Sequence, residues 1–171
     1  MALSGFNTPI SRSETPLLSE VRFRRQTCKI TVSGILSDMD GTLIDSTNAI
    51  VKHWERIGQT YGIDPKVILA TSHGRRSIDV FQTIDPANAN WDFVRQMEGE
   101  IPTLFGNDAE EILGARQLFS TLELLDLKWA IVTSGTRPLV EGWLKVLKLL
   151  EPEYMITAED ETNGKPDPEP Y

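Results

Sequence analysis

The feature that most constrains the fold is a short apolar run that ends directly at two aspartates. Residues 29–37 (KITVSGILS) mix β-branched and aliphatic residues as a buried strand does, and Asp38 and Asp40 follow them. After a glycine turn, apolar residues at helical spacing from Ile50 to Tyr61 predict a helix. The two carboxylates are therefore expected just beyond the carboxyl end of a strand.

The remainder of the core alternates helices and strands. The pattern predicts a helix over about 111–125, a strand over 128–133 (KWAIVT), a helix over about 137–150 and a short strand over about 154–157. Such alternation implies an α/β fold with a Rossmann-like parallel sheet and helices on both faces. Ligands of these sheets bind beyond the carboxyl ends of the strands, where both Asp38 and Thr133 are expected.

A long stretch between the two sheet units carries helical signals alone. Residues 62–106 are therefore interpreted as an inserted α-helical cap, and residues 30–61 with 107–171 as the α/β core. Residues 1–29 are expected to form a disordered tail. Residues 1–25 also resemble, faintly, an organelle transit peptide, because they are rich in Ser, Thr, Pro and Arg.

Charge and composition restrict the partners. The net charge of the 171-residue chain is −8, and the acidic residues are concentrated after residue 29. An acidic body argues against nucleic acid as a partner, since phosphate backbones are bound by basic patches. No apolar run reaches the 18 residues that span a bilayer, and the single cysteine, Cys28, cannot form an intrachain disulfide. We expect a cytoplasmic protein without membrane partners, and a monomer, although the sequence does not settle the oligomeric state.

Residues 38–42 (DMDGT) carry the strongest chemical signal. Two carboxylates at the mouth of a strand can bind a hard cation such as Mg²⁺, and one of them can act as a nucleophile. Taken alone, the pair could equally cap a helix or form a surface turn. The whole phrase, a hydrophobic strand followed by Asp-x-Asp-Gly-Thr-Leu, resembles the first motif of the haloacid dehalogenase superfamily of phosphatases.

The resemblance implies a two-step mechanism. Asp38 would attack phosphorus to form an aspartyl-phosphate, while Asp40 would protonate the leaving alcohol and later deprotonate the hydrolytic water. Mg²⁺ would be held by the Asp38 carboxylate and the Asp40 backbone carbonyl, and would screen the repulsion between two anions. The resemblance thus implies a magnesium-dependent phosphatase acting on a small phosphate ester.

Two further motifs follow in the order that the family has them. Residues 131–136 (IVTSGT) deliver a hydroxyl at a strand end and backbone N–H groups at a helix start, so the family's phosphate-binding role would be taken by Thr133, helped by Ser134. Residues 164–168 (GKPDP) resemble the lysine motif, in which Lys165 would reach the phosphate. Alone, the first motif is an ordinary helix cap and the second a surface lysine.

Segments in and near the expected cap resemble a smaller group of phosphatases within this superfamily. Residues 72–76 (SHGRR), 98–102 (EGEIP) and 164–171 (GKPDPEPY) look like fungal glycerol-3-phosphate phosphatases and their relatives acting on 2-deoxyglucose-6-phosphate. Caps of such enzymes close over the site, which makes His73, Arg76 and Glu98 the candidates for substrate specificity. A turn residue, a surface charge and a solvated helix face remain the alternative interpretations of these three side chains.

The family pattern continues, after the lysine motif, through another strand to an acidic motif that completes the magnesium site. Because this chain ends at Tyr171, we expect an incomplete core, from a truncated gene product or an incomplete gene model, with weak or absent activity. Two other functions stay open: an inactive remnant that binds phosphate or a partner protein, and a phosphomutase that shares the aspartyl-phosphate intermediate. Which phosphate ester is bound is not given by the sequence.

Overall fold

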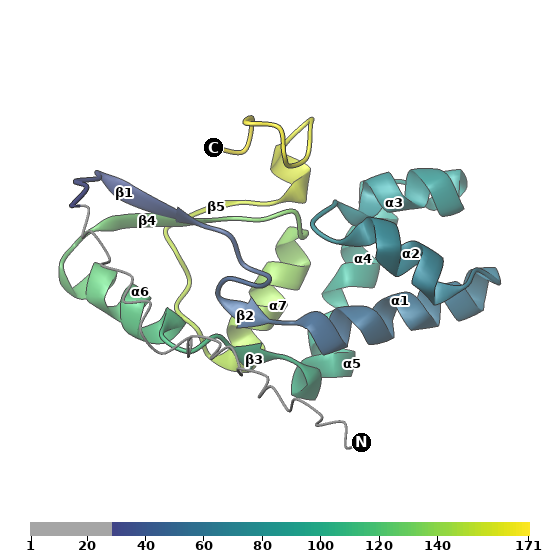
Figure 1. Ribbon diagram of the computed structural model, residues 1–171, viewed down its shortest axis with the longest axis horizontal. Coiled ribbons are helices and arrows are strands. Elements are labelled where there is room, and N and C mark those ends of the chain that lie inside the picture. The colour runs from purple at the N-terminus through teal and green to yellow at the C-terminus, as the bar shows by residue number, and fades with distance from the viewer. Residues whose placement is uncertain (1–28) are drawn as a thin grey trace, which may run out of the picture. The chain divides into compact units, whose positions relative to one another are not determined.

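The computed structural model describes residues 29–171 of the chain (Figure 1). The predicted tail, the transit-peptide resemblance and Cys28 lie outside the described residues, apart from residue 29 at the tail's end. Every helix and strand described below belongs to a compact unit that runs from Val32 to Tyr171. No helix in this part of the chain is long and apolar enough to cross a membrane.

The predicted parallel sheet is confirmed. Strands β1 (Gly34–Ser37), β4 (Lys128–Val132) and β5 (Tyr154–Ile156) pair in the order β1-β4-β5, all parallel. Strand β1 begins at Gly34 rather than Lys29, because its ladder starts where Gly34 meets Lys128, the first residue of β4. The predicted strand was therefore too long at its start and correct at the end that carries the aspartates.

The core helices are α6 (Ala115–Leu124) and α7 (Arg137–Leu147). Both pack on one face of the sheet (Figure 1). There Trp129 and Ile131 of β4 join the apolar side chains of these helices in a single buried cluster. The expectation of helices on both faces is wrong for the described residues. The strands step in one direction, and right-handed crossovers then place successive helices on the same face.

On the other face of the sheet the side chains at the two outer strands are exposed to solvent. Leu36 of β1 is 53% exposed and Tyr154 of β5 is 59% exposed. These residues line a shallow apolar depression of about 580 Å³, to which the C-terminal Tyr171 also contributes. The two faces of the sheet thus differ in how far they are covered by residues 29–171.

A small two-stranded antiparallel sheet precedes the second half of the core. Strand β2 (Ile44–Asp45) pairs antiparallel with β3 (Glu110–Glu111), so the chain leaves the core and returns to it side by side. The sequence did not predict these strands, since two residues are too few to show a periodicity. The predicted helix from about residue 111 begins instead at Ala115, after Gly114 with a φ of 97°.

Between β2 and β3 the chain is helical, as expected. The helices are α1 (Thr47–Tyr61), α2 (Pro65–Ser72), α3 (Ser77–Ile84), α4 (Trp91–Gly99) and α5 (Ile101–Phe105), with 3₁₀ turns η2 (Pro86–Asn88) and η3 (Gly106–Asp108). A second apolar cluster, centred on Phe81 and Val94, packs these helices together. Because Trp54 and Ile57 of α1 belong to this cluster, α1 packs with the helical region. The domain boundaries at residues 62 and 106 stay a prediction.

Candidate active site

The loop after β1 is a tight turn that fixes both aspartates. The Met39 carbonyl accepts hydrogen bonds from the backbone N–H groups of Thr42, Leu43 and Ile44, at 2.8–3.2 Å. Gly41 has a φ of 78°, which a side chain would disfavour. With the Met39 side chain fully buried in the core, the residues on either side of it, Asp38 and Asp40, are left at the carboxyl edge of the sheet.

Asp38 is open to solvent and held by a cation. Its side chain is 41% exposed, and the Lys165 ammonium donates to Asp38 Oδ1 at 2.9 Å. The same ammonium donates to the Val132 carbonyl at the end of β4, at 2.7 Å. Lys165 therefore lies across the edge formed by β1 and β4, where its charge offsets that of the exposed carboxylate.

Asp40 lies in a more enclosed position. Burial raises the pKa of its carboxyl, and the neighbouring Asp38 charge raises it further, against the lowering effects of Ser46 and Lys165. The Ser46 hydroxyl donates to Asp40 Oδ1 and orients that carboxyl. A carboxyl with a raised pKa beside an exposed carboxylate that is paired with a lysine is the arrangement of an acid next to a nucleophile.

The turn from β4 into α7 forms the opposite wall. Thr133 is buried, and its Oγ1 accepts from the Gly135 N–H at 3.1 Å. The Ser134 hydroxyl is buried without a hydrogen-bond partner among the described residues. Because this turn leads into the N-terminus of an 11-residue helix, its N–H groups favour an anionic ligand.

These walls enclose a cavity of about 300 Å³. Every predicted site residue except Arg76 lines it, namely Asp38, Asp40, His73, Glu98, Thr133, Ser134 and Lys165. His73 is exposed, in the turn between α2 and α3. The structure therefore brings residues that are far apart in the sequence around one space: they come from the ends of β1 and β4, from the C-terminal segment and from the helical region.

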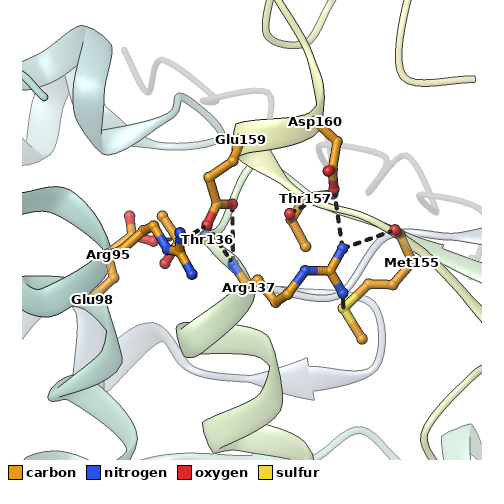
Figure 2. Close-up of polar contacts among 8 residues, drawn as sticks. All are labelled: Arg95, Glu98, Thr136, Arg137, Met155, Thr157, Glu159 and Asp160. Carbon is orange, nitrogen blue, oxygen red and sulfur yellow. Dashed lines mark hydrogen bonds and ion pairs between the residues drawn. The ribbon is translucent and has the colours of Figure 1, made fainter. Parts of the chain in front are cut away.

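Glu98 of α4 is buried at the inner wall, 4% exposed. Its carboxylate accepts from the Thr136 N–H at the start of α7, at 2.8 Å; Figure 2 shows these two residues. It also accepts from the Ser77 hydroxyl. Burial raises the pKa of Glu98, while these hydrogen bonds oppose the shift and the nearby Asp40 charge adds to it. Since both oxygens already have partners, Glu98 joins α4 to α7.

A second contact joins the same elements on the outside. Glu159, in the 3₁₀ turn η4 (Ala158–Asp160), accepts from the Arg137 N–H at 3.1 Å and forms an ion pair with Arg95 of α4 at 3.4 Å (Figure 2). The Arg137 guanidinium in turn contacts Asp160 at 3.3 Å. The start of α7 is thus covered by carboxylates from two segments.

Arg76 does not line the cavity. Its guanidinium is paired with Asp79 and donates to the carbonyls of Glu161 and Thr162, at 3.0 and 3.1 Å. Local patterns in the sequence could not indicate these contacts, nor the roles of Ser46, Ser77 and Thr136, because short polar residues near helix starts are ordinarily read as caps.

The sequence from β1 to the C-terminus matches one family over most of its length. A model of the haloacid dehalogenase-like hydrolase family matches residues 35–171. The chain belongs to the haloacid dehalogenase-like hydrolase family. The resemblance given by the motifs is therefore confirmed.

Individual curated proteins are also similar in sequence to this haloacid dehalogenase-like chain. The chain is 40% identical to glycerol-1-phosphate phosphohydrolase 1 of Saccharomyces cerevisiae over 142 residues, which are 82% of this chain and 57% of the relative. It is 36% identical to 2-deoxyglucose-6-phosphate phosphatase 1 of the same yeast over 80% of this chain and 60% of the relative. The chain thus spans little more than half the length of these relatives.

The fold has solved counterparts as well. A hydrolase from Pseudomonas syringae superposes with a TM-score of 0.63 at 24% identity, covering 80% of this chain and 66% of that one. At this identity the likeness supports the fold alone.

Proposed function

We propose that this haloacid dehalogenase-like chain forms part of a phosphatase that hydrolyses a small polyol or sugar phosphate through an aspartyl-phosphate on Asp38. The observation that carries the proposal is the pairing at the sheet edge. Asp38 is exposed to the cavity and accompanied by a cation, whereas Asp40, two residues on, has a carboxyl whose pKa is raised by burial. The curated relatives, named for glycerol 1-phosphate and 2-deoxyglucose 6-phosphate, support this substrate class.

In the first step an Asp38 carboxylate oxygen attacks phosphorus and the bond from phosphorus to the ester oxygen breaks. The leaving alcohol takes a proton from Asp40. In the second step water attacks phosphorus, Asp40 takes its proton, and the bond to Asp38 breaks to release inorganic phosphate. Ser46 orients Asp40 through both steps, because its hydroxyl donates to Asp40 Oδ1.

The other cavity groups bind the phosphoryl oxygens. The buried Ser134 hydroxyl lacks a partner among residues 29–171, and it lies in the turn that leads into the N-terminus of α7, where the helix dipole favours an anion. Lys165 neutralises charge as the phosphoryl group arrives. The cavity of about 300 Å³ fits a small alcohol portion better than a polymer.

A divalent metal ion fits this site in part. The carboxylate of Asp38 and the backbone carbonyl of Asp40 are oxygen donors of the kind that Mg²⁺ prefers. No group of three or more His, Cys, Asp or Glu side chains suited to a metal occurs in the described residues. When bound, Mg²⁺ would supply charge neutralisation between nucleophile and ester.

The test is phosphate release from glycerol 1-phosphate and 2-deoxyglucose 6-phosphate, with and without Mg²⁺, by the native chain and by Asp38→Asn. Release that requires both Mg²⁺ and Asp38 supports the proposal. Phosphate binding without release, by a folded chain, would instead favour the non-enzymatic alternative. Conversion of a hexose phosphate to an isomer without free phosphate would favour the phosphomutase.

A further inference from the structure

Arg76 is the most heavily engaged side chain at the boundary between the helical region and the core. It is 8% exposed, although arginine is rarely buried unless paired. Its Nε and Nη2 atoms donate to the two oxygens of Asp79 at 2.9 and 3.0 Å. Nη1 donates to the carbonyls of Glu161 and Thr162, at 3.0 and 3.1 Å, across 85 and 86 residues of sequence.

The Arg76 side chain also packs against Gly164. A methyl group added to Gly164 would lie 2.8 Å from Arg76 Nε, closer than real contacts of this kind, and 3.1 Å from Arg76 Cδ, a tight contact. The φ of Gly164 is not positive, so its lack of a side chain serves this close approach rather than a special backbone conformation. Arg76 therefore holds the segment 161–164 through its charged end and through its stem.

Lys165 follows this segment directly. Its ammonium lies 2.9 Å from Asp38 Oδ1 and 2.7 Å from the Val132 carbonyl. A long flexible side chain keeps such a position only if its backbone is fixed. On the other side, Arg76 is the N-cap of α3, at the end of the turn that carries His73 into the cavity.

We propose that Arg76 is a positioning residue, which ties the turn at His73 to the segment 161–164 and thereby sets Lys165 on Asp38. The inference rests on the proposed function, because Lys165 and Asp38 matter as a pair only for phosphoryl chemistry. Arg76 itself contacts neither substrate nor reacting atoms. This positioning role is proposed in place of the role in substrate specificity that the sequence suggested for Arg76.

The chain contains a matched control. Arg116 of α6 is bound in the same way, with Nε 2.9 Å from Glu111 Oε2 and with Nη1 and Nη2 on the carbonyls of Lys148 and Leu147, at 2.6 and 2.9 Å. It does not line the active-site cavity. Losing Arg116 removes a comparable set of hydrogen bonds away from Lys165.

The first measurement is the acylation rate of Lys165, determined by mass spectrometry with a small amine-reactive ester and with Lys52 as an internal reference. Lys165 is 17% exposed, whereas Lys52 is 49% exposed. Arg76→Met should raise the rate for Lys165 several-fold relative to Lys52, and Arg116→Met should not. A general loss of stability would raise both rates together.

The second measurement is the affinity for inorganic phosphate, by calorimetry. Arg76→Met should weaken it about tenfold, since a displaced charge no longer meets the anion. Arg76→Lys keeps the charge and most of the stem but lacks the planar fork, and should lie between native and Arg76→Met in both measurements. This variant also decides the question if Arg76→Met does not fold.

Gly164→Ala perturbs the same contact from the other side. It should reproduce the Arg76→Met effects, and the double variant should be no worse than either change alone. Unchanged Lys165 acylation in Arg76→Met and Gly164→Ala would overturn the proposal, as would faster acylation with unaltered phosphate affinity. If the native chain binds no phosphate, the proposed function fails, while Lys165 acylation still decides the role of Arg76.

Discussion

The two sides of the cavity use polar groups in opposite ways. At the sheet edge, the Asp38 carboxylate is 41% exposed and the Ser134 hydroxyl has no partner within residues 29–171. On the helical side, both oxygens of Glu98 and all three nitrogens of the Arg76 guanidinium group are hydrogen-bonded within the chain. The sheet edge therefore offers groups that can react, whereas the helical side uses its charges to hold the walls together.

This difference has a physical origin. The sheet-edge groups follow strands whose backbone is fixed by parallel ladders, so their places depend less on contacts with the helical region. Helices packed by an apolar cluster of their own need specific links to the core, and buried charges provide such links only when fully paired. Changes on the sheet side should thus affect chemistry, and changes on the helical side should affect stability and position.

The largest expected effect comes from the sheet side. Asp40→Asn removes the proton donor and should lower turnover about 10²- to 10⁴-fold in the phosphate-release assay. Inorganic phosphate should still bind, because the amide keeps the size of the carboxyl and adds no negative charge to the cavity. Asp45→Asn is the matched control, since Asp45 is exposed and bonds only to the Thr47 N–H among its described contacts. Equal turnover by native chain and Asp40→Asn would remove the acid-base assignment.

The second prediction concerns His53, on the helix α1 that leads from the core into the helical region. His53 is 1% exposed, and neither ring nitrogen has a hydrogen-bond partner in the described part of the chain. Burial lowers its pKa from 6.5 to about 4, and Arg56 adds to the effect. Between these values the unfolded chain binds a proton that the folded chain does not, so stability falls as the pH is lowered.

The resulting loss is about 3 kcal/mol in the free energy of unfolding between pH 7 and pH 4. Denaturant titrations at several pH values should show it in the native chain and not in His53→Leu. His73→Leu, which changes the chain's exposed second histidine, should follow the native curve. Parallel curves for all three proteins would mean that His53 is protonated in the folded state.

The sequence predicts the sheet side of the molecule better than the helical side. The motif residues Asp38, Thr133 and Lys165 line one cavity, and each could be picked out from the sequence because it belongs to a local pattern at a strand end or turn. The length of β1 was overestimated, since pairing with β4 rather than composition decides where the ladder starts. The one-sided covering of the sheet follows from the strand order, which local patterns do not contain.

On the helical side, the sequence identified residues but not their partners. Glu98 was chosen for substrate specificity, yet its contacts are with Ser77, 21 residues away, and Thr136, 38 residues away. Such pairings depend on how α3, α4 and α7 pack, and no residue pattern within one helix records that. Whether Glu98 also contacts substrate stays a prediction.

The smallest expected effect distinguishes these two roles of Glu98. In Glu98→Gln the amide oxygen can accept from the Thr136 N–H and the amide nitrogen can donate to the Ser77 hydroxyl, so the links survive without their charge. In Glu98→Met the buried Thr136 N–H loses its acceptor, which should lower the free energy of unfolding by about 1–3 kcal/mol. Glu100→Gln, at an exposed ion pair with Arg56, should change stability by less than about 0.5 kcal/mol.

Steady-state kinetics on the same variants complete the comparison. If Glu98 only joins α4 to α7, Glu98→Gln keeps the native ratio of KM values for glycerol 1-phosphate and 2-deoxyglucose 6-phosphate, and its stability lies between native and Glu98→Met. A changed KM ratio in a variant of native stability would mean that the Glu98 carboxylate also contacts the alcohol portion of the substrate. Glu98 would then act on the substrate as well as join α4 to α7. Of the two charged residues compared on the helical side, only Arg76 would then have a purely positioning role.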